Sequence, residues 1–265
     1  MAEGLEPAWV LHRRSYGDNG LLIELLGLNT GRFSAVVRGT RRKAHGGSVL
    51  ALLQPFSPLL VAVRGRAELK SLQQLESAGP RLNLSGLQLL SGLYLNELLI
   101  RVLPRFDGQP SLFAQYGAAL EGLASAGLDA EASASGLPVA GEEALRRFEL
   151  SLLSSLGYAL AFDRDGDGDV IESQYLYTFD PAVGFQRCVF SEAGSNDERS
   201  NDEGGGRYSG GQLHVIDHWL NDTAVLNQTC RRALKGVTRA ALAVLLGDRP
   251  LRARELARQY REIAE

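Results

Sequence analysis

The spacing of apolar residues changes once along the chain, near Leu84, and this change constrains the fold more than any other feature. Before it, short apolar runs alternate with glycine- and asparagine-rich turns, which is typical of β-strands joined by hairpins. The runs lie at residues 8–12, 21–28, 32–37, 59–63 and 67–72. Five short strands predict a small closed barrel, because a β-sandwich generally needs about seven.

After Leu84, apolar residues recur with the 3.6-residue period of amphipathic helices. This period predicts helices at residues 84–103, 111–126, 142–160, 212–220, 223–246 and 251–263. Residues 163–211 lack the period: 175–179 and 184–189 are strand-like, and 191–211 is too polar to fold alone, which predicts a mobile loop.

These patterns predict an α+β fold, in which a five-stranded barrel precedes an α-helical domain with a small irregular insert. A chain of 265 residues is long for one core, so we expect more than one folded unit. The expected domains are 1–81 for the barrel, 82–162 with 212–265 for the helices, and 163–211 for the insert.

The formal net charge of −3 hides an uneven distribution. Residues 1–81 carry 11 basic and 6 acidic side chains, and residues 212–265 carry 9 and 6. Residues 82–162 carry 4 basic and 8 acidic side chains, and the insert at 163–211 carries 4 and 11. Basic ends around an acidic middle indicate an anionic partner at the ends.

The cellular location is expected to be the cytoplasm. No apolar run reaches the ~18 residues of a membrane span, and no secretion signal opens the sequence. Cys188 and Cys230 cannot form a disulfide framework, and so few cysteines suit a reducing compartment.

The strongest basic cluster follows the third predicted strand, and other arginines lie at neighbouring strand ends. Trp9, Tyr16 and Phe33 are near them in sequence, and basic side chains with aromatic ones are typical of barrels that bind nucleic acid. The alternative is a solvated loop with the aromatic rings in the core. The candidate DNA-binding residues of this region are Arg13, Arg14, Arg38, Arg41, Arg42, Lys43, Arg64 and Arg66.

A second basic cluster lies toward the end of the chain. Arg232, Lys235 and Arg239 share one face of a predicted helix. An ordinary solvent-exposed helix face is the alternative to anion binding. The candidates here are Arg231, Arg232, Lys235, Arg239, Arg252 and Arg254.

Two further patterns suggest metal ions. Asp163, Asp165, Asp167 and Asp169 resemble the start of a calcium loop, but Gln174 stands where the closing glutamate belongs, so a crowded surface turn is the preferred interpretation. His214 and His218, with Asp217, are spaced as in some zinc enzymes, and Cys188 and Cys230 could add ligands, but a surface histidine pair is more common. We therefore assign no metal site.

No phosphate loop, nucleophile elbow or dinucleotide fingerprint occurs, so we expect neither enzyme activity nor a cofactor.

Several longer stretches of the sequence indicate a family. They occur in the same order as in the bacterial recombination mediator family RecO, which the chain resembles from near its start to near its end. These stretches are Trp9-Val10-Leu11-His12-Arg13, Thr30-Gly31-Arg32, Val37-Arg38-Gly39-Thr40-Arg41, Leu53-Gln54-Pro55-Phe56-Ser57-Pro58-Leu59-Leu60, Leu84-Ser85-Gly86, Ser91-Gly92-Leu93-Tyr94-Leu95-Asn96-Glu97-Leu98-Leu99, Ala144-Leu145-Arg146-Arg147-Phe148-Glu149-Leu150 and Arg249-Pro250-Leu251-Arg252-Ala253-Arg254-Glu255-Leu256.

The resemblance implies an N-terminal OB-fold barrel followed by a helical domain. It implies a cytoplasmic, nucleoid-associated protein of DNA repair and recombination that binds single- and double-stranded DNA and anneals complementary strands. It also implies that RecR, and in many bacteria RecF, act with it to load RecA onto DNA covered by single-stranded DNA-binding protein (SSB), whose acidic C-terminal tail it docks. The resemblance further implies that DNA is contacted by Arg38, Arg41, Arg42 and Lys43, and less directly by Arg252 and Arg254.

One departure from the family pattern concerns zinc. Many RecO proteins carry four zinc-binding cysteines in the region of 163–211, where this chain has only Cys188. A structural zinc is therefore not expected.

The sequence is thus consistent with three functions. The first is a non-enzymatic DNA-binding and annealing mediator. The second is a protein-interaction adaptor that mainly docks the acidic tail of SSB, and the third, more remote, is a metal-dependent hydrolase using His214, His218 and the aspartate run.

Overall fold

The fold was analysed in a computed structural model of the chain. The structure describes residues 4–18, 20–38, 43–44, 47–125, 136–188 and 206–264, with only the main chain described at 43, 44, 47 and 264. Contacts along the chain define two compact units. The first holds the N-terminal strands, α2, α3, the start of α4 and α7; the second holds the rest of α4, α5, α6 and a small sheet.

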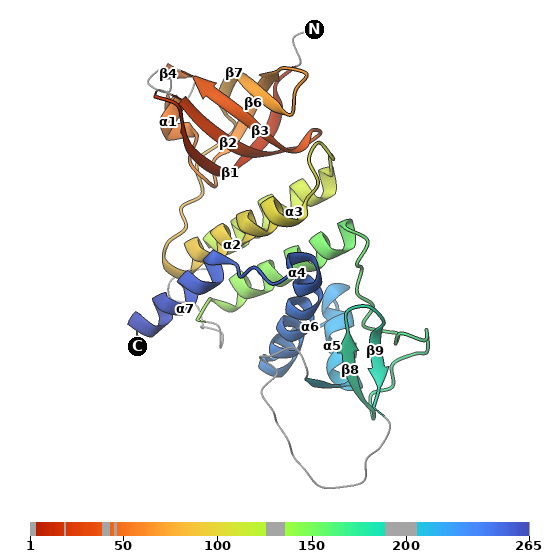
Figure 1. Ribbon diagram of the computed structural model, residues 1–265. Coiled ribbons are helices and arrows are strands. Elements are labelled where there is room, and N and C mark those ends of the chain that lie inside the picture. Colours follow the sequence, from red (N-terminus) through yellow and green to blue (C-terminus); the bar gives the residue numbers. More distant parts are fainter. Residues whose placement is uncertain are drawn as a thin grey trace. The chain divides into compact units, whose positions relative to one another are not determined.

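The N-terminal strands form a closed five-stranded barrel, which confirms the predicted OB-fold class (Figure 1). The strand order around the barrel is β1-β2-β3-β7-β6, with β3 and β7 parallel and the other pairs antiparallel. The strands are β1 (Glu6–Tyr16), β2 (Gly20–Gly27), β3 (Gly31–Arg38), β6 (Pro58–Arg64) and β7 (Leu69–Ser77).

Alternation of side chains gives the barrel its interior. Ile23, Ala35 and Val37 belong to the buried core, whereas Glu24 and Arg38 on the same strands do not. This is the two-residue period expected when one face of each strand is buried. The short helix α1 (Val49–Leu52) adds Val49 and Leu52 to the same core. Two short strands, β4 (Lys43–Ala44) and β5 (Gly47–Ser48), precede α1.

Besides α1, the helices of the first unit are α2 (Gly86–Val102), α3 (Pro110–Ser125), the first residues of α4 (Val139–Ser155) and α7 (Arg252–Ala264). A buried polar contact joins α2 and α3 to the barrel at a β-bulge in β1. The Asn96 amide donates to the Leu11 carbonyl at 2.9 Å, and the Tyr116 hydroxyl donates to the Asn96 Oδ1 atom at 2.5 Å. Burial raises the pKa of Tyr116, so this hydroxyl keeps its proton.

The second unit contains α5 (Gly210–Leu220), α6 (Gln228–Leu246) and a three-stranded sheet in the order β10-β8-β9. Its strands are β8 (Leu176–Asp180), β9 (Gly184–Arg187) and β10 (Arg207–Ser209). Tyr177, Phe185 and Tyr208 from these strands lie in one buried core with α5 and α6. The predicted strand pair at 175–189 is therefore present. The predicted loop at 191–211 falls outside the described residues up to 205, but Arg207–Ser209 is a strand rather than a loop.

Two predicted helix boundaries differ from the structure by five residues. The helix predicted to run to 160 ends at Ser155, because Gly157 has a positive φ of 86° and stops it. The helix predicted from 223 begins at Gln228, because the side chain of Asn227 accepts a hydrogen bond from the Cys230 amide and caps it there. None of the helices in the described part of the chain has the length and apolar content needed to cross a membrane.

Candidate nucleic-acid interface

A row of paired residues crosses all five barrel strands and has an arginine at each end. Arg14 of β1 pairs with Leu22 of β2, and Leu22 pairs with Val36 of β3. Val36 pairs with Ser71 of β7, which pairs with Arg64 of β6. Four strand spacings correspond to about 19 Å of surface. The register thus places two arginines that are 50 positions apart in the sequence at the two ends of one row.

The side chains of this row point away from the barrel core. Ile23, Ala35 and Val37, which lie next to the row along their strands, belong to the core, so their neighbours Leu22, Val36 and Arg38 face outward. Arg38 is two positions beyond Val36 on the same face. We define the outer arginine row as Arg14, Arg38 and Arg64. All three are exposed, and none forms an ion pair or hydrogen bond with any residue that the structure describes.

Two other predicted residues of the barrel, Arg66 and Arg13, differ from this row. Arg66 is exposed in the turn between β6 and β7. Arg13 lies on the inward-facing register, paired with Ile23, and its Nη1 atom donates to the Leu50 carbonyl at 3.2 Å, so it helps hold α1. Two carboxylates, Asp18 and Glu68, lie in the neighbouring turns and are exposed.

The centre of the predicted basic loop lies outside the part of the chain that the structure describes. Arg41 and Arg42 lie outside the described residues, as does the side chain of Lys43, whose main chain begins β4. Their role in DNA binding stays a prediction from the sequence.

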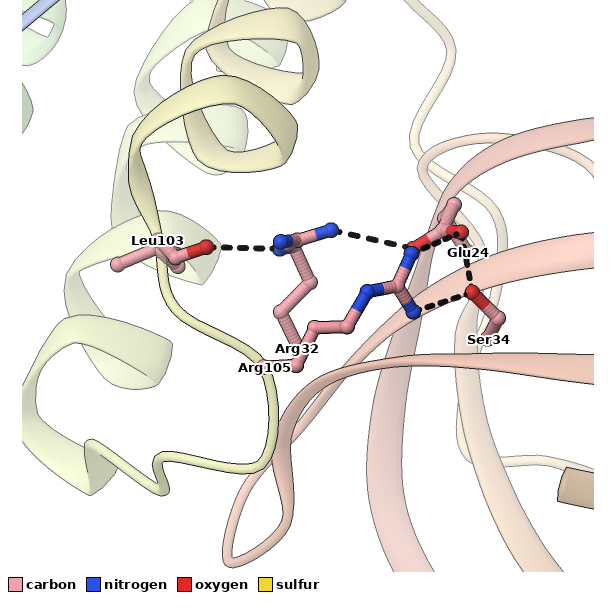
Figure 2. A network of polar contacts seen from close by, with 5 residues as sticks. All are labelled: Glu24, Arg32, Ser34, Leu103 and Arg105. Atoms are coloured by element: carbon pink, nitrogen blue, oxygen red, sulfur yellow. Dashed lines mark hydrogen bonds and ion pairs between the residues drawn. The ribbon is translucent and has the colours of Figure 1, made fainter. Parts of the chain in front are cut away.

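A polar network on the outer face of β2 and β3 lies beside the row and was not predicted from the sequence (Figure 2). Glu24 forms ion pairs with Arg32 at 3.5 Å and with Arg105 at 3.2 Å, and it accepts a hydrogen bond from the Ser34 hydroxyl. Arg105 also donates to Ser34 at 2.5 Å, and Arg32 Nε donates to the Leu103 carbonyl at 3.0 Å. Two guanidinium groups share one carboxylate, so the network adds a net positive charge to this face.

The network also fixes the segment after α2 against the barrel. Burial lowers the pKa of Arg32, and the charge of Arg105 adds to this effect, whereas Glu24 opposes it. The Glu24–Ser34 pair could have been found from the strand register, but Arg105 lies 71 positions from Ser34 and follows no strand pattern.

The second basic cluster lies on α6, in the other unit. Arg232 and Arg239 are exposed and Lys235 is half-buried, which agrees with one solvent-facing side of the helix. Arg231 is turned back to its own loop, where Nη1 donates to the Leu226 carbonyl at 2.5 Å.

The two arginines predicted on α7 have different surroundings. Arg252 is exposed, and its main-chain amide donates to Glu97 at 3.1 Å. Arg254 donates to the Tyr94 hydroxyl at 2.9 Å and lies over the Tyr94 ring, with its Cζ atom 5.0 Å from the centroid. Arg254 therefore contributes to the contact between α2 and α7.

The aspartate run forms a closed turn. The Asp165 carboxylate accepts hydrogen bonds from the Asp167 and Asp169 amides, and Arg164 pairs with Asp163 at 3.6 Å. Within the described ranges, no group of three or more acidic, histidine or cysteine side chains is arranged to hold a metal ion.

The two histidines of α5 have protein partners. His214 contacts the Ile171 carbonyl at 2.7 Å and the Ser173 hydroxyl at 3.0 Å, and His218 contacts Thr223 at 3.2 Å. Burial raises the pKa of the Cys230 thiol, which disfavours the thiolate that binds zinc. These contacts give no support to the remote hydrolase hypothesis.

Comparisons with known proteins cover nearly the whole chain. Residues 1–81 match the family described as "Recombination protein O N terminal" and residues 84–255 match "Recombination protein O C terminal". The chain is 39% identical over 259 residues to a protein of Pseudomonas aeruginosa strain PAO1 named "DNA repair protein RecO", covering 97% of this chain and 96% of that protein. Proteins of the same name from Pseudoalteromonas atlantica (37% over 254 residues; 95% and 92% covered) and Pasteurella multocida (36% over 260 residues; 97% and 96% covered) are also similar.

Proposed function

The chain belongs to the Recombination protein O family of DNA repair proteins, and on this basis we propose that it binds DNA without sequence preference and anneals complementary strands. We further propose that it helps load RecA onto single-stranded DNA coated with SSB, acting with RecR and, in some settings, RecF. None of these steps requires a bond to be made or broken, so the proposed role is that of a mediator rather than an enzyme.

The observation that carries the proposal is the outer arginine row. Arg14, Arg38 and Arg64 are exposed on about 19 Å of barrel surface and have no carboxylate partner among the described residues. A guanidinium without an internal partner is available for a phosphate, to which it can donate two parallel hydrogen bonds.

The same charges give a physical route to annealing. Each arginine that binds a phosphate releases condensed counterions, which supplies affinity independent of sequence. Two strands bound at one positive surface repel each other less, because their phosphates are neutralised, and complementary bases can then pair. The Glu24 network, with two arginines and one carboxylate, extends the positive surface beside the row.

The test of DNA binding is a salt titration of the full chain with labelled single-stranded and duplex oligonucleotides. We expect the logarithm of the association constant to fall linearly with the logarithm of the salt concentration, by about 0.7 for each neutralised phosphate of a single strand. Binding that does not change with salt, or no binding at low salt, would contradict the proposal.

The second candidate function, docking of the acidic SSB tail, is favoured by the exposed basic side of α6, where Arg232 and Arg239 lie. A labelled acidic C-terminal peptide separates the two functions. If DNA binding on the barrel is the main activity, excess peptide should leave most DNA binding intact, because the two sites use different residues. If the adaptor function dominates, the peptide should bind tightly while DNA binds weakly and is displaced.

A further inference from the structure

Of the three aromatic residues near the basic strand ends, two are accounted for by the core. Phe33 is completely buried inside the barrel, and Trp9 is 8% exposed and packs edge-on against Tyr116, with ring centroids 5.7 Å apart. Tyr16 is different, because it is 46% exposed at the end of β1. It makes no hydrogen bond or ring contact with any residue that the structure describes.

Tyr16 shares the outer face with the arginine row. It pairs with Gly20 of β2, which in turn pairs with Arg38 of β3, and Arg14 is two positions before it on the same strand. Residues two apart on a strand face the same side, so the side chains of Arg14, Tyr16 and Arg38 belong to one surface. Tyr16 and Arg38 are two strand spacings apart, which is about 10 Å.

The position between Tyr16 and Arg38 is restricted to glycine. A Cβ atom at Gly20 would lie 2.7 Å from the Tyr16 carbonyl oxygen and 3.3 Å from that of Val37, so any side chain would force the backbone to shift. Gly20 therefore contributes no side chain between the Tyr16 ring and the Arg38 guanidinium. The outer face at the end of β1 thus has the exposed ring of Tyr16, with Arg14 two residues before it on the same strand. Arg38 lies across the glycine position, on β3.

We propose that Tyr16 stacks against an unpaired nucleobase while Arg14 and Arg38 hold the adjoining phosphates, so that this part of the barrel selects single-stranded over duplex DNA. The inference rests on the proposed DNA-binding function and adds a selectivity that the arginines alone do not supply. Phosphates are present on both forms of DNA, whereas the flat face of a base is covered by its neighbours in a duplex and is available in a single strand. Stacking also requires no particular base, since every base has an aromatic face.

The test compares Tyr16→Ala and Tyr16→Phe with the wild-type chain, using labelled single-stranded and duplex oligonucleotides of equal length. Tyr16→Ala is expected to weaken single-strand binding by about 5- to 100-fold and duplex binding by less than about twofold. The salt dependence should be unchanged, because no charge is removed. Tyr16→Phe keeps the ring and should bind single strands as the wild type does.

An oligonucleotide that lacks bases but keeps its phosphates is the matched control ligand. The wild type and Tyr16→Ala should bind to it equally well. Equal losses on single-stranded and duplex DNA, an unchanged single-strand affinity, or a Tyr16→Phe loss as large as that of Tyr16→Ala would each overturn the stacking role. In these cases the wild type still binds DNA and the proposed function stands. If the wild type binds neither form, the proposed function fails and the stacking role fails with it.

Discussion

Replacing Arg14, Arg38 and Arg64 together with alanine is expected to weaken binding to single-stranded DNA by about 100-fold at moderate salt. The three side chains are exposed and have no carboxylate partner among the described residues, so their removal takes away phosphate contacts without exposing the core. The slope of log affinity against log salt should become shallower by about 2, since each contact to a single strand contributes about 0.7. Fluorescence anisotropy across a salt series measures both quantities.

The matched control removes the same charge at other places. Arg164, Arg187 and Arg258 are exposed but pair with Asp163, Glu172 and Glu262, respectively. Replacing these three with alanine should change affinity by only a few-fold and leave the salt slope nearly unchanged. If this variant loses as much affinity as the first, then net charge rather than the position of the arginine row determines binding.

Removing Glu149 is expected to lower the free energy of unfolding of the second unit by about 3–5 kcal/mol. Glu149 on α4 is fully buried and pairs with Arg146, which is 8% exposed and also donates to Thr238 of α6 at 3.2 Å. Leucine at position 149 would leave the Arg146 guanidinium buried without its carboxylate. Urea denaturation of Glu149→Leu against the wild type measures the effect.

Two variants show whether the loss comes from an unpaired charge. Replacing both partners, Arg146→Met with Glu149→Leu, should recover most of the stability, because the buried charge is removed along with its partner. Asp222→Asn breaks the ion pair with Arg147, in which the Asp222 side chain is 81% exposed, and should cost less than about 1 kcal/mol. A Glu149→Leu cost no larger than that of Asp222→Asn would show that the buried pair is not a main source of stability.

The spacing of apolar residues predicts the helices, and short apolar runs with turn residues between them predict the barrel, because each element has a buried face. The two boundary errors have local causes that periodicity does not contain. Gly157 and the Asn227 cap act through backbone conformation and a single side-chain hydrogen bond. The strand at Arg207–Ser209 was also missed, since Tyr208 is its one fully buried residue and three residues are too few to show a period.

The candidate site could be predicted only in part, because composition reveals cations but not their partners. Arg38 and Arg64 are exposed as the charge pattern suggested, whereas Arg13 and Arg231 donate to main-chain carbonyls of their own unit. Arg105 approaches Ser34 from 71 positions away, and no short-range pattern indicates such a contact. Likewise, the sequence grouped Tyr16 with two aromatic residues that the fold buries.

The most direct test of the account is the annealing of complementary single strands that have first been coated with the cognate SSB. The wild-type chain should accelerate annealing, and the variant lacking Arg14, Arg38 and Arg64 should do so much less, while the control variant at Arg164, Arg187 and Arg258 should match the wild type. Annealing that the wild-type chain leaves unchanged, or that the first variant accelerates equally well, would contradict the claim that the barrel surface pairs DNA strands.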